Sequence, residues 1–280
     1  MSLVVNTNVM SLVAQTNLNN TQNKLNNAIT QLSSGLRINS AMDDPAGLQI
    51  ATAMQSQVNG MNQGVINANA AISMAQVADG ALGSVTNMLQ QMRTLAVEAA
   101  NGTNTGSGDA NLQAEFTQLA TQINNTLGNT QFNGISVFSM ASGGITYQVG
   151  ANTGDTVVVA SNTLATDTNI SNLAVSGTVN ISTVGGANSA LSAIDTALND
   201  VNTSRASNGA YQIQFQQIVS STQINSQNTA AAVSQIMDTN YAQATSNLTQ
   251  AQIVQQAGTA MLSQANAIPQ GVLSLLSKLP

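Results

Sequence analysis

The stretch LSSGLRINSAMDDPAG, residues 32–47, decides how this chain is divided. Its Ser-Ser-Gly triplet predicts the end of a helix, because serine competes for backbone hydrogen bonds and glycine costs backbone entropy. Asp44 then predicts an N-cap, and Pro45 suits the first helical position, where its missing N–H is no loss. We therefore expect a joint between two helical layers. The residues expected to form it are Ser33, Ser34, Gly35, Arg37, Asp44 and Pro45.

Apolar residues on both sides of the joint repeat with the spacing of a coiled coil. The seam before the joint comprises Leu18, Leu25, Ile29, Leu32 and Leu36. After the joint, steps of four and three run from Met54 to Ala99, which predicts one helix of more than about fifty residues, roughly 80 Å long. Such a helix needs partner helices along its length. Asp79 on this seam either fixes the register as a buried polar group or faces water, and we favour the second interpretation.

The middle of the chain is different in kind. Residues 101–110 predict a turn, and residues 112–127 predict a third helix. At about 130–160, apolar residues alternate around Asn-Gly and Thr-Gly dipeptides, which predicts small β-hairpins. Helix is expected to resume near Ala190 and to end in a final helix. The seam expected for that helix comprises Tyr241, Ala244, Leu248, Ala251, Val254, Ala257, Met261, Ala265, Ile268 and Val272.

Charge is scarce in this sequence. Charged residues make up 6% of the chain and aromatic residues 2%, whereas a soluble domain has about 25% charged residues. Polarity comes instead from 35 Asn and 29 Gln residues. Residues 1–42 and 241–280 contain three basic residues and no carboxylate. Because net charge normally keeps surfaces apart, we expect such a chain to associate with copies of itself and both ends to be buried in a partner or an assembly. The alternative is a composition bias of the organism.

The composition excludes several classes of protein. The chain has no histidine and no cysteine, which removes the usual nucleophile arrangements and zinc ligand sets. We expect no enzyme and no catalytic, cofactor-binding or metal site. Five basic residues in an acidic chain argue against nucleic-acid binding, and no run approaches the ~18 apolar residues of a membrane span. The first residues lack the pattern of a secretory leader, so we expect any export to proceed without leader cleavage.

These patterns predict a mainly α fold. We expect a long helical coiled-coil bundle with paired N- and C-terminal helices and a small β-hairpin region. Five segments, in this order, resemble bacterial flagellin, the subunit of the flagellar filament. The segments are LSSGLRINSAMDDPAGLQIA, MLQQMRTLAVEAANG, TQFNGISVF, YQVGAN and SNLTQAQIVQQAGTAMLSQANAIPQGVLSLL.

The resemblance implies a layered subunit. Residues 1–42 and 241–280 would form an inner coiled-coil core that lines the filament channel. Residues 43–160 and 190–240 would form an outer helical layer that includes the β-hairpins. Residues 161–189 would be a short, variable surface loop, so that the large outer domain of longer flagellins is absent. Serine and threonine in this loop either carry O-linked sugars or simply solvate it.

The resemblance also implies partners. The chain would be a homo-oligomer in the extracellular filament of a motile bacterium, exported unfolded through the growing filament. An export chaperone would hold the C-terminal helix, and filament cap and junction proteins would contact the assembled chains. Gln91 stands where an arginine is common in the family, so we expect reduced activation of an innate immune receptor. The receptor contact carries over onto Leu89, Gln90, Gln91, Arg93, Leu95 and Glu115.

Two alternatives remain. A hook-filament junction protein shares the N-terminal pattern but forms only a short collar, and the full ending LSQANAIPQGVLSLL favours the filament subunit. A secreted adhesin that uses a coiled coil for display would need a binding surface within residues 130–190.

Overall fold

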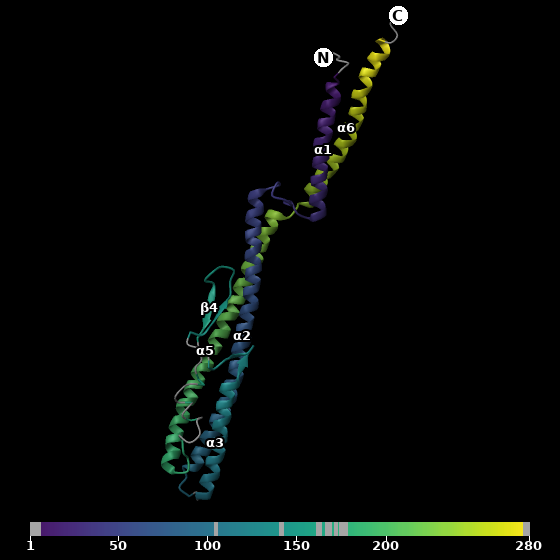
Figure 1. Cartoon of the computed structure of the whole chain (residues 1–280). Helices are drawn as coiled ribbons and strands as arrows, with labels where there is room; N and C mark the ends of the chain where they lie inside the picture. Colours follow the sequence, from purple (N-terminus) through teal and green to yellow (C-terminus); the bar gives the residue numbers. More distant parts are fainter. Residues whose placement is uncertain are drawn as a thin grey trace. The chain divides into compact units, whose positions relative to one another are not determined.

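A computed structural model describes residues 7–103, 106–139, 143–160, 164, 165, 170, 173 and 179–276. The chain folds into two compact units, Met1–Gln55 with Asn228–Pro280, and Ser56–Gln227. Long helices dominate the described residues, which confirms the predicted fold class (Figure 1). The helices are α1 (Val9–Ser34), α2 (Pro45–Ala99), α3 (Gly106–Asn129), α5 (Val184–Met237) and α6 (Tyr241–Leu276).

The first unit is built on an antiparallel pair formed by α1 and α6, which lie side by side (Figure 1). Near the start of α1, the side-chain amide of Asn8 donates a hydrogen bond to the Ala265 carbonyl oxygen at 2.8 Å. At the other end, the Tyr241 hydroxyl donates to the Leu32 carbonyl oxygen at 3.3 Å. Early residues of one helix therefore meet late residues of the other. The predicted pairing of the terminal helices is confirmed.

The seam of α1 differs from the prediction at two positions. Its buried residues are Ser11, Thr21, Leu25 and Ala28. Ile29, which was predicted on the seam, is 49% exposed, and Leu36 lies beyond the end of the helix. Alternating steps of four and three lead from Thr21 through Leu25 to Ala28, so a small residue takes the seam position and lets α6 approach closely.

The seam of α6 is also shifted from the prediction over part of its length. Ala244, Ala251 and Ala265 are buried as expected, and Leu248 is half-buried. Tyr241, Val254, Ala257, Met261 and Ile268 are exposed instead. The half-buried positions after Ala251 are Gln255, Gly258, Leu262 and Pro269. Apolar character misidentified the seam because polar and small residues occupy it, while apolar residues form a separate exposed stripe.

The second unit pairs α2 with α5 in antiparallel orientation. Arg205 Nε lies 2.9 Å from Asp79 Oδ1, and Arg93 Nε lies 3.1 Å from Asp195 Oδ1. The predicted long helix is confirmed, since α2 contains 55 residues. Asp79 neither fixes the register as a buried group nor points freely into water. Its side chain is 41% exposed and paired with Arg205.

Two apolar clusters fill the second unit. The larger one joins α2, α3 and the first turns of α5 around fully buried side chains such as Leu82, Phe116 and Ile194. The smaller one surrounds Phe215, whose ring meets the Tyr147 ring edge-on at 5.7 Å between centroids. These two aromatic rings lie where a hairpin covers the helices, and each ring buries a large apolar area there.

Two predicted boundaries were wrong by several residues. Helix α3 begins at Gly106, inside the segment predicted as a turn. The carboxylate of Asp109 in the first turn interacts favourably with the helix dipole. Burial of Phe116, two turns later, holds the helix against the core. Helix α5 begins at Val184 rather than near Ala190. The Thr183 hydroxyl accepts a hydrogen bond from the Gly186 N–H at 3.1 Å and caps it.

The predicted hairpins are present. Strand β1 (Gln131–Phe132) pairs with β2 (Ile135–Ser136), and β3 (Ile145–Gln148) pairs with β4 (Thr156–Val159), both antiparallel. The two residues that join β1 to β2, Asn133 and Gly134, both have positive φ angles of 50° and 77°, as the mirror-image turn of a two-residue hairpin requires. None of the helices in the described part of the chain combines the length and apolar character needed to cross a bilayer.

The hairpin of β3 and β4 lies against α2 through two glycines. A Cβ added at Gly60 would meet Ala151 Cβ at 2.8 Å, and one added at Gly64 would meet the Val149 carbonyl carbon at 2.6 Å. Asn67, one turn further on, donates from its side-chain amide to the Gln148 carbonyl oxygen at 2.9 Å. The absence of side chains on one face of α2 is therefore what lets the hairpin dock.

We expect Gly64→Ala to destabilise the full chain by about 1–3 kcal/mol, because the added methyl group would overlap hairpin backbone. Gly80→Ala, in the same helix, is the control, since its added Cβ would meet no atom within 4 Å. That control should gain about 0.5–1 kcal/mol from reduced backbone entropy. Urea unfolding followed by circular dichroism measures both changes, and equal effects of the two substitutions would contradict the docking account.

Candidate functional site: the joint and the paired terminal helices

The joint begins where α1 ends. Gly35 has a φ of 73°, the left-handed conformation that favours glycine, and its N–H donates to the Gln31 carbonyl oxygen at 2.9 Å. Its own carbonyl oxygen accepts a hydrogen bond from the Thr239 N–H at 2.9 Å. The glycine thus both ends α1 and binds the returning chain just before α6.

Arg37 caps the end of α5. Its N–H donates to the Met237 carbonyl oxygen at 2.6 Å, and its guanidinium Nη2 donates to the Ile236 carbonyl oxygen at 2.6 Å. Leu36 and Asp238, which lie between the Gly35–Thr239 and Arg37–Met237 hydrogen bonds, form an isolated antiparallel β-bridge. Helix α5 has no basic residue in its last turn. A cation from a distant part of the chain therefore supplies the favourable charge at its C-terminus.

The start of α2 is held by two adjacent carboxylates. The Gly47 N–H donates to Asp44 Oδ1 at 2.9 Å, so the predicted N-cap before Pro45 is present. Asp43 Oδ2 accepts from the N–H groups of Asn39 at 3.0 Å and Ser40 at 2.9 Å. These backbone hydrogen bonds, together with one from the Ser40 hydroxyl, hold the pKa of Asp43 below its ordinary value.

All six residues predicted for the joint lie in the last turn of α1, at the first residue of α2, or between the two helices. Gly35, Arg37 and Asp44 make the contacts described above, and Pro45 is the first residue of α2. The Ser34 hydroxyl accepts from the Leu36 N–H at 3.1 Å, and Ser33 is exposed in the last turn of α1. The residue set predicted for the joint omitted Asp43, although its contacts with Asn39 and Ser40 are local. It also omitted the segment 236–241, which lies some two hundred residues away, so no local pattern could have indicated it.

An apolar groove runs between the start of α1 and the end of α6. It has a volume of about 600 Å³. Val13 on its wall is 54% exposed and Met261 is 61% exposed. The other large apolar side chains along it are Val9, Met10, Val254, Ile268 and Pro269. A contiguous apolar surface of this kind marks a site of interaction with another molecule.

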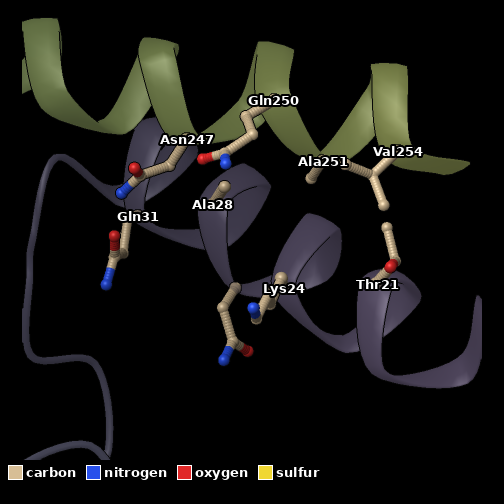
Figure 2. A pocket seen from close by; sticks show the side chains of 9 residues that line it. Thr21, Lys24, Ala28, Gln31, Asn247, Gln250, Ala251 and Val254 are labelled. Carbon is tan, nitrogen blue, oxygen red and sulfur yellow. The ribbon is translucent and has the colours of Figure 1, made fainter. Parts of the chain in front are cut away.

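Nearer the joint, the groove between α1 and α6 becomes polar, with a volume of about 410 Å³. Figure 2 shows the amide side chains of Gln31 and Asn247 beside the small side chain of Ala28. Further along, Gln255 Nε2 donates to Gln22 Oε1 at 2.7 Å. An amide pair therefore joins the two helices beside this groove, whose lining also includes Lys24.

The residues predicted for the immune-receptor contact lie in the second unit. Leu89 and Leu95 belong to the large apolar cluster, with exposed fractions of 0% and 9%. Gln90, Gln91 and Glu115 are exposed, and so is Arg93, which pairs with Asp195. The structure therefore brings four polar residues to the surface and assigns the two leucines to the core.

Comparison with known proteins identifies the family. The bacterial flagellin N-terminal helical region matches residues 5–143, and the bacterial flagellin C-terminal helical region matches residues 191–276. This chain belongs to the flagellin family. A flagellar filament 33 kDa core protein of Treponema phagedenis is 35% identical over 285 positions, which cover 98% of this chain and all of that protein.

Two further matches are to a relative and to a solved structure. Polar flagellin F of Vibrio parahaemolyticus is 31% identical over an alignment of 376 positions that covers 99% of this chain and all of that protein. The crystal structure of Bacillus cereus flagellin is 30% identical and covers 56% of this chain and 88% of its own, with a TM-score of 0.49. With 280 residues, this chain fits a short form of the family.

The family defines the role of the chain. This flagellin is a structural subunit of the bacterial flagellar filament, which is extracellular and serves motility. Flagellins are structural proteins, so the chain is not an enzyme.

Protonation of Asp43 should loosen the joint in acid. The folded-state pKa of Asp43 lies below its ordinary value of 3.8, so its contribution to stability is present above that value. The contribution is lost as the pH falls through the folded-state pKa. Amide NMR shifts of Asn39 and Ser40 should titrate with a midpoint below 3.8, and Asp43→Asn should remove the transition. A midpoint at or above 3.8 would contradict this assignment.

Proposed function

We propose that this flagellin assembles with copies of itself through the pair formed by α1 and α6. The exposed apolar groove carries the proposal, because Val13 and Met261 leave more than half of their surfaces in water. Fully burying a side chain of this size is worth about 1.5–3 kcal/mol. A neighbouring copy that covered several such side chains would gain an interaction comparable to the stability of a whole domain.

The division into layers is part of this proposal. Residues 1–42 and 241–280 form the inner core that lines the channel, and residues 43–160 with 190–240 form the outer layer. The absence of carboxylates from the two ends supports the inner position, since unpaired charges are costly to bury. The surface loop predicted for 161–189 takes the place of a large outer domain, but residues 184–189 belong to α5 and Ile181 is buried. Most of 161–178 lies outside the described residues.

Export and partner binding complete the proposal. The chain leaves the cell unfolded through the growing filament, with an export chaperone on α6 and filament cap and junction proteins at the filament's ends. Helices α1 and α6 have a largely small or polar seam, which gives them little stability as an isolated pair. Weak pairing before assembly suits a chain that must pass through a narrow channel.

A contact with an innate immune receptor is supported only by the exposed members of the predicted set. Gln90, Gln91, Arg93 and Glu115 are exposed in the second unit, whereas the two leucines are buried. Receptor activation is therefore expected to be reduced but present. Gln91→Arg should strengthen the response in a reporter-cell titration by restoring the cation common in the family. Gln76→Arg, at an exposed position of the same helix outside the predicted contact, is the control, and an unchanged response to Gln91→Arg would count against the contact.

Seeded polymerisation tests the assembly surface. We expect Val13→Ser and Met261→Ser each to remove about 1 kcal/mol of burial per contact and to raise the critical concentration about fivefold. The controls are Gln15→Ser and Gln252→Ser, which change exposed residues of the same two helices outside the groove. Sedimentation of filaments grown from short seeds measures the concentration left in solution.

The alternatives predict different results from the same experiment. A junction protein would stop after a short collar on each seed, and a secreted adhesin would leave the seeds unchanged. Equal effects of the groove substitutions and their controls would remove the groove from the assembly surface.

A further inference from the structure

Pro269 leaves one backbone carbonyl of α6 without its helical partner. The proline lies inside α6, and it has no N–H to donate to the carbonyl four residues earlier. That carbonyl belongs to Ala265, a buried residue on the face of α6 that meets α1. The site is part-buried, and a carbonyl left there without a hydrogen bond is costly, so its position calls for a donor from outside the helix.

Asn8 supplies that donor. Its side-chain Nδ2 lies 2.8 Å from the Ala265 carbonyl oxygen, across a sequence separation of 257 residues. The Oδ1 atom of the same amide accepts a hydrogen bond from the Ser11 N–H at 3.1 Å and caps the start of α1. One amide thus satisfies an unpaired donor of α1 and an unpaired acceptor of α6. Only asparagine combines an N-cap acceptor with a donor at this reach.

The joint ties one end of the α1–α6 pair through the hydrogen bonds of Thr239 with Gly35 and of Tyr241 with Leu32, so the register is least constrained at the other end, where α1 begins. The buried residues of α1 are Ser11, Thr21, Leu25 and Ala28, and the α6 side of the seam contains Ala251 and Gly258. Towards the start of α1 the buried residue is the small Ser11, so knob packing adds little to the register there. Ordinary helical carbonyls are already bonded within α6. The carbonyl freed by Pro269 is therefore a distinctive acceptor for the Asn8 amide on this face.

We propose that Asn8 and Pro269 act together as a register lock for the α1–α6 pair. The proline leaves the Ala265 carbonyl free to accept, and the Asn8 side chain donates to it while also capping α1. A pair slipped by one turn loses the hydrogen bond and leaves the Ala265 carbonyl buried and unsatisfied. The inference deepens the proposed assembly function, because register determines how the apolar groove is presented to a neighbouring copy.

Engineered disulfides report the register, since the native chain has no cysteine. Gln22→Cys with Gln255→Cys reports the register described here, because those side chains are in contact. Gln22→Cys with Gln252→Cys or with Thr259→Cys reports slips of about one turn in either direction. Cross-linking is measured on the full chain, both in solution and after seeded growth. A loss of filament growth, which concerns assembly, is thereby separated from a change of register.

The lock is tested with Asn8→Ser, Pro269→Ala and the double substitution, in each cysteine background. Serine keeps the N-cap but is too short to reach Ala265, and alanine restores the missing N–H inside α6. Each single substitution should raise the ratio of slipped to native cross-links about fivefold, as loss of one net hydrogen bond implies. The double substitution should add no more. Asn19→Ser, at an exposed position of α1, should leave the ratio unchanged.

Two results would overturn the lock. Additive effects of Asn8→Ser and Pro269→Ala would mean that the two residues act independently. An unchanged ratio in Pro269→Ala would mean that the freed carbonyl does not set the register, and this outcome decides the matter even if Asn8→Ser fails to fold or to grow.

Discussion

The first unit depends on the backbone hydrogen bonds that join the two passages of the chain at the joint. Thr239 donates to Gly35 at 2.9 Å and Arg37 donates to Met237 at 2.6 Å, which ties residues two hundred positions apart. With that tie in place, the end of α1 lies beside the start of α6, and the two helices run antiparallel. Arg37 can then cap α5 with its guanidinium. Without the tie, the last carbonyl groups of α5 would lose the donors that Arg37 supplies.

Amides take the place of charges in this flagellin. Two ion pairs, Arg93 with Asp195 and Arg205 with Asp79, join α2 to α5. The terminal pair relies instead on Asn8 with Ala265 and on Gln22 with Gln255. Amide contacts are weaker than charge-assisted ones but avoid the cost of burying a charge. Such a surface is suited to repeated contact with identical copies, where like charges would repel.

The sequence predicted the elements better than it predicted their faces. The long α2 helix, the hairpins and the Asp44 cap followed from local patterns with strong physical signals. The seams of α1 and α6 did not, because Ala28 and Gln255 take positions that apolar counting assigned to Ile29 and Val254. Contacts such as that of Arg37 with Ile236 require knowledge of which distant segments meet. The predicted joint was located by composition alone, whereas its partners appeared only in three dimensions.

The most direct test of this account is a structure of the filament grown from the full chain. The account predicts that the groove between α1 and α6 is covered by a neighbouring copy, with Val13 and Met261 buried and the Asn8–Ala265 hydrogen bond intact. A filament in which this groove stays open to water, with contacts between copies made by the second unit alone, would contradict the claim that the paired terminal helices are the assembly surface.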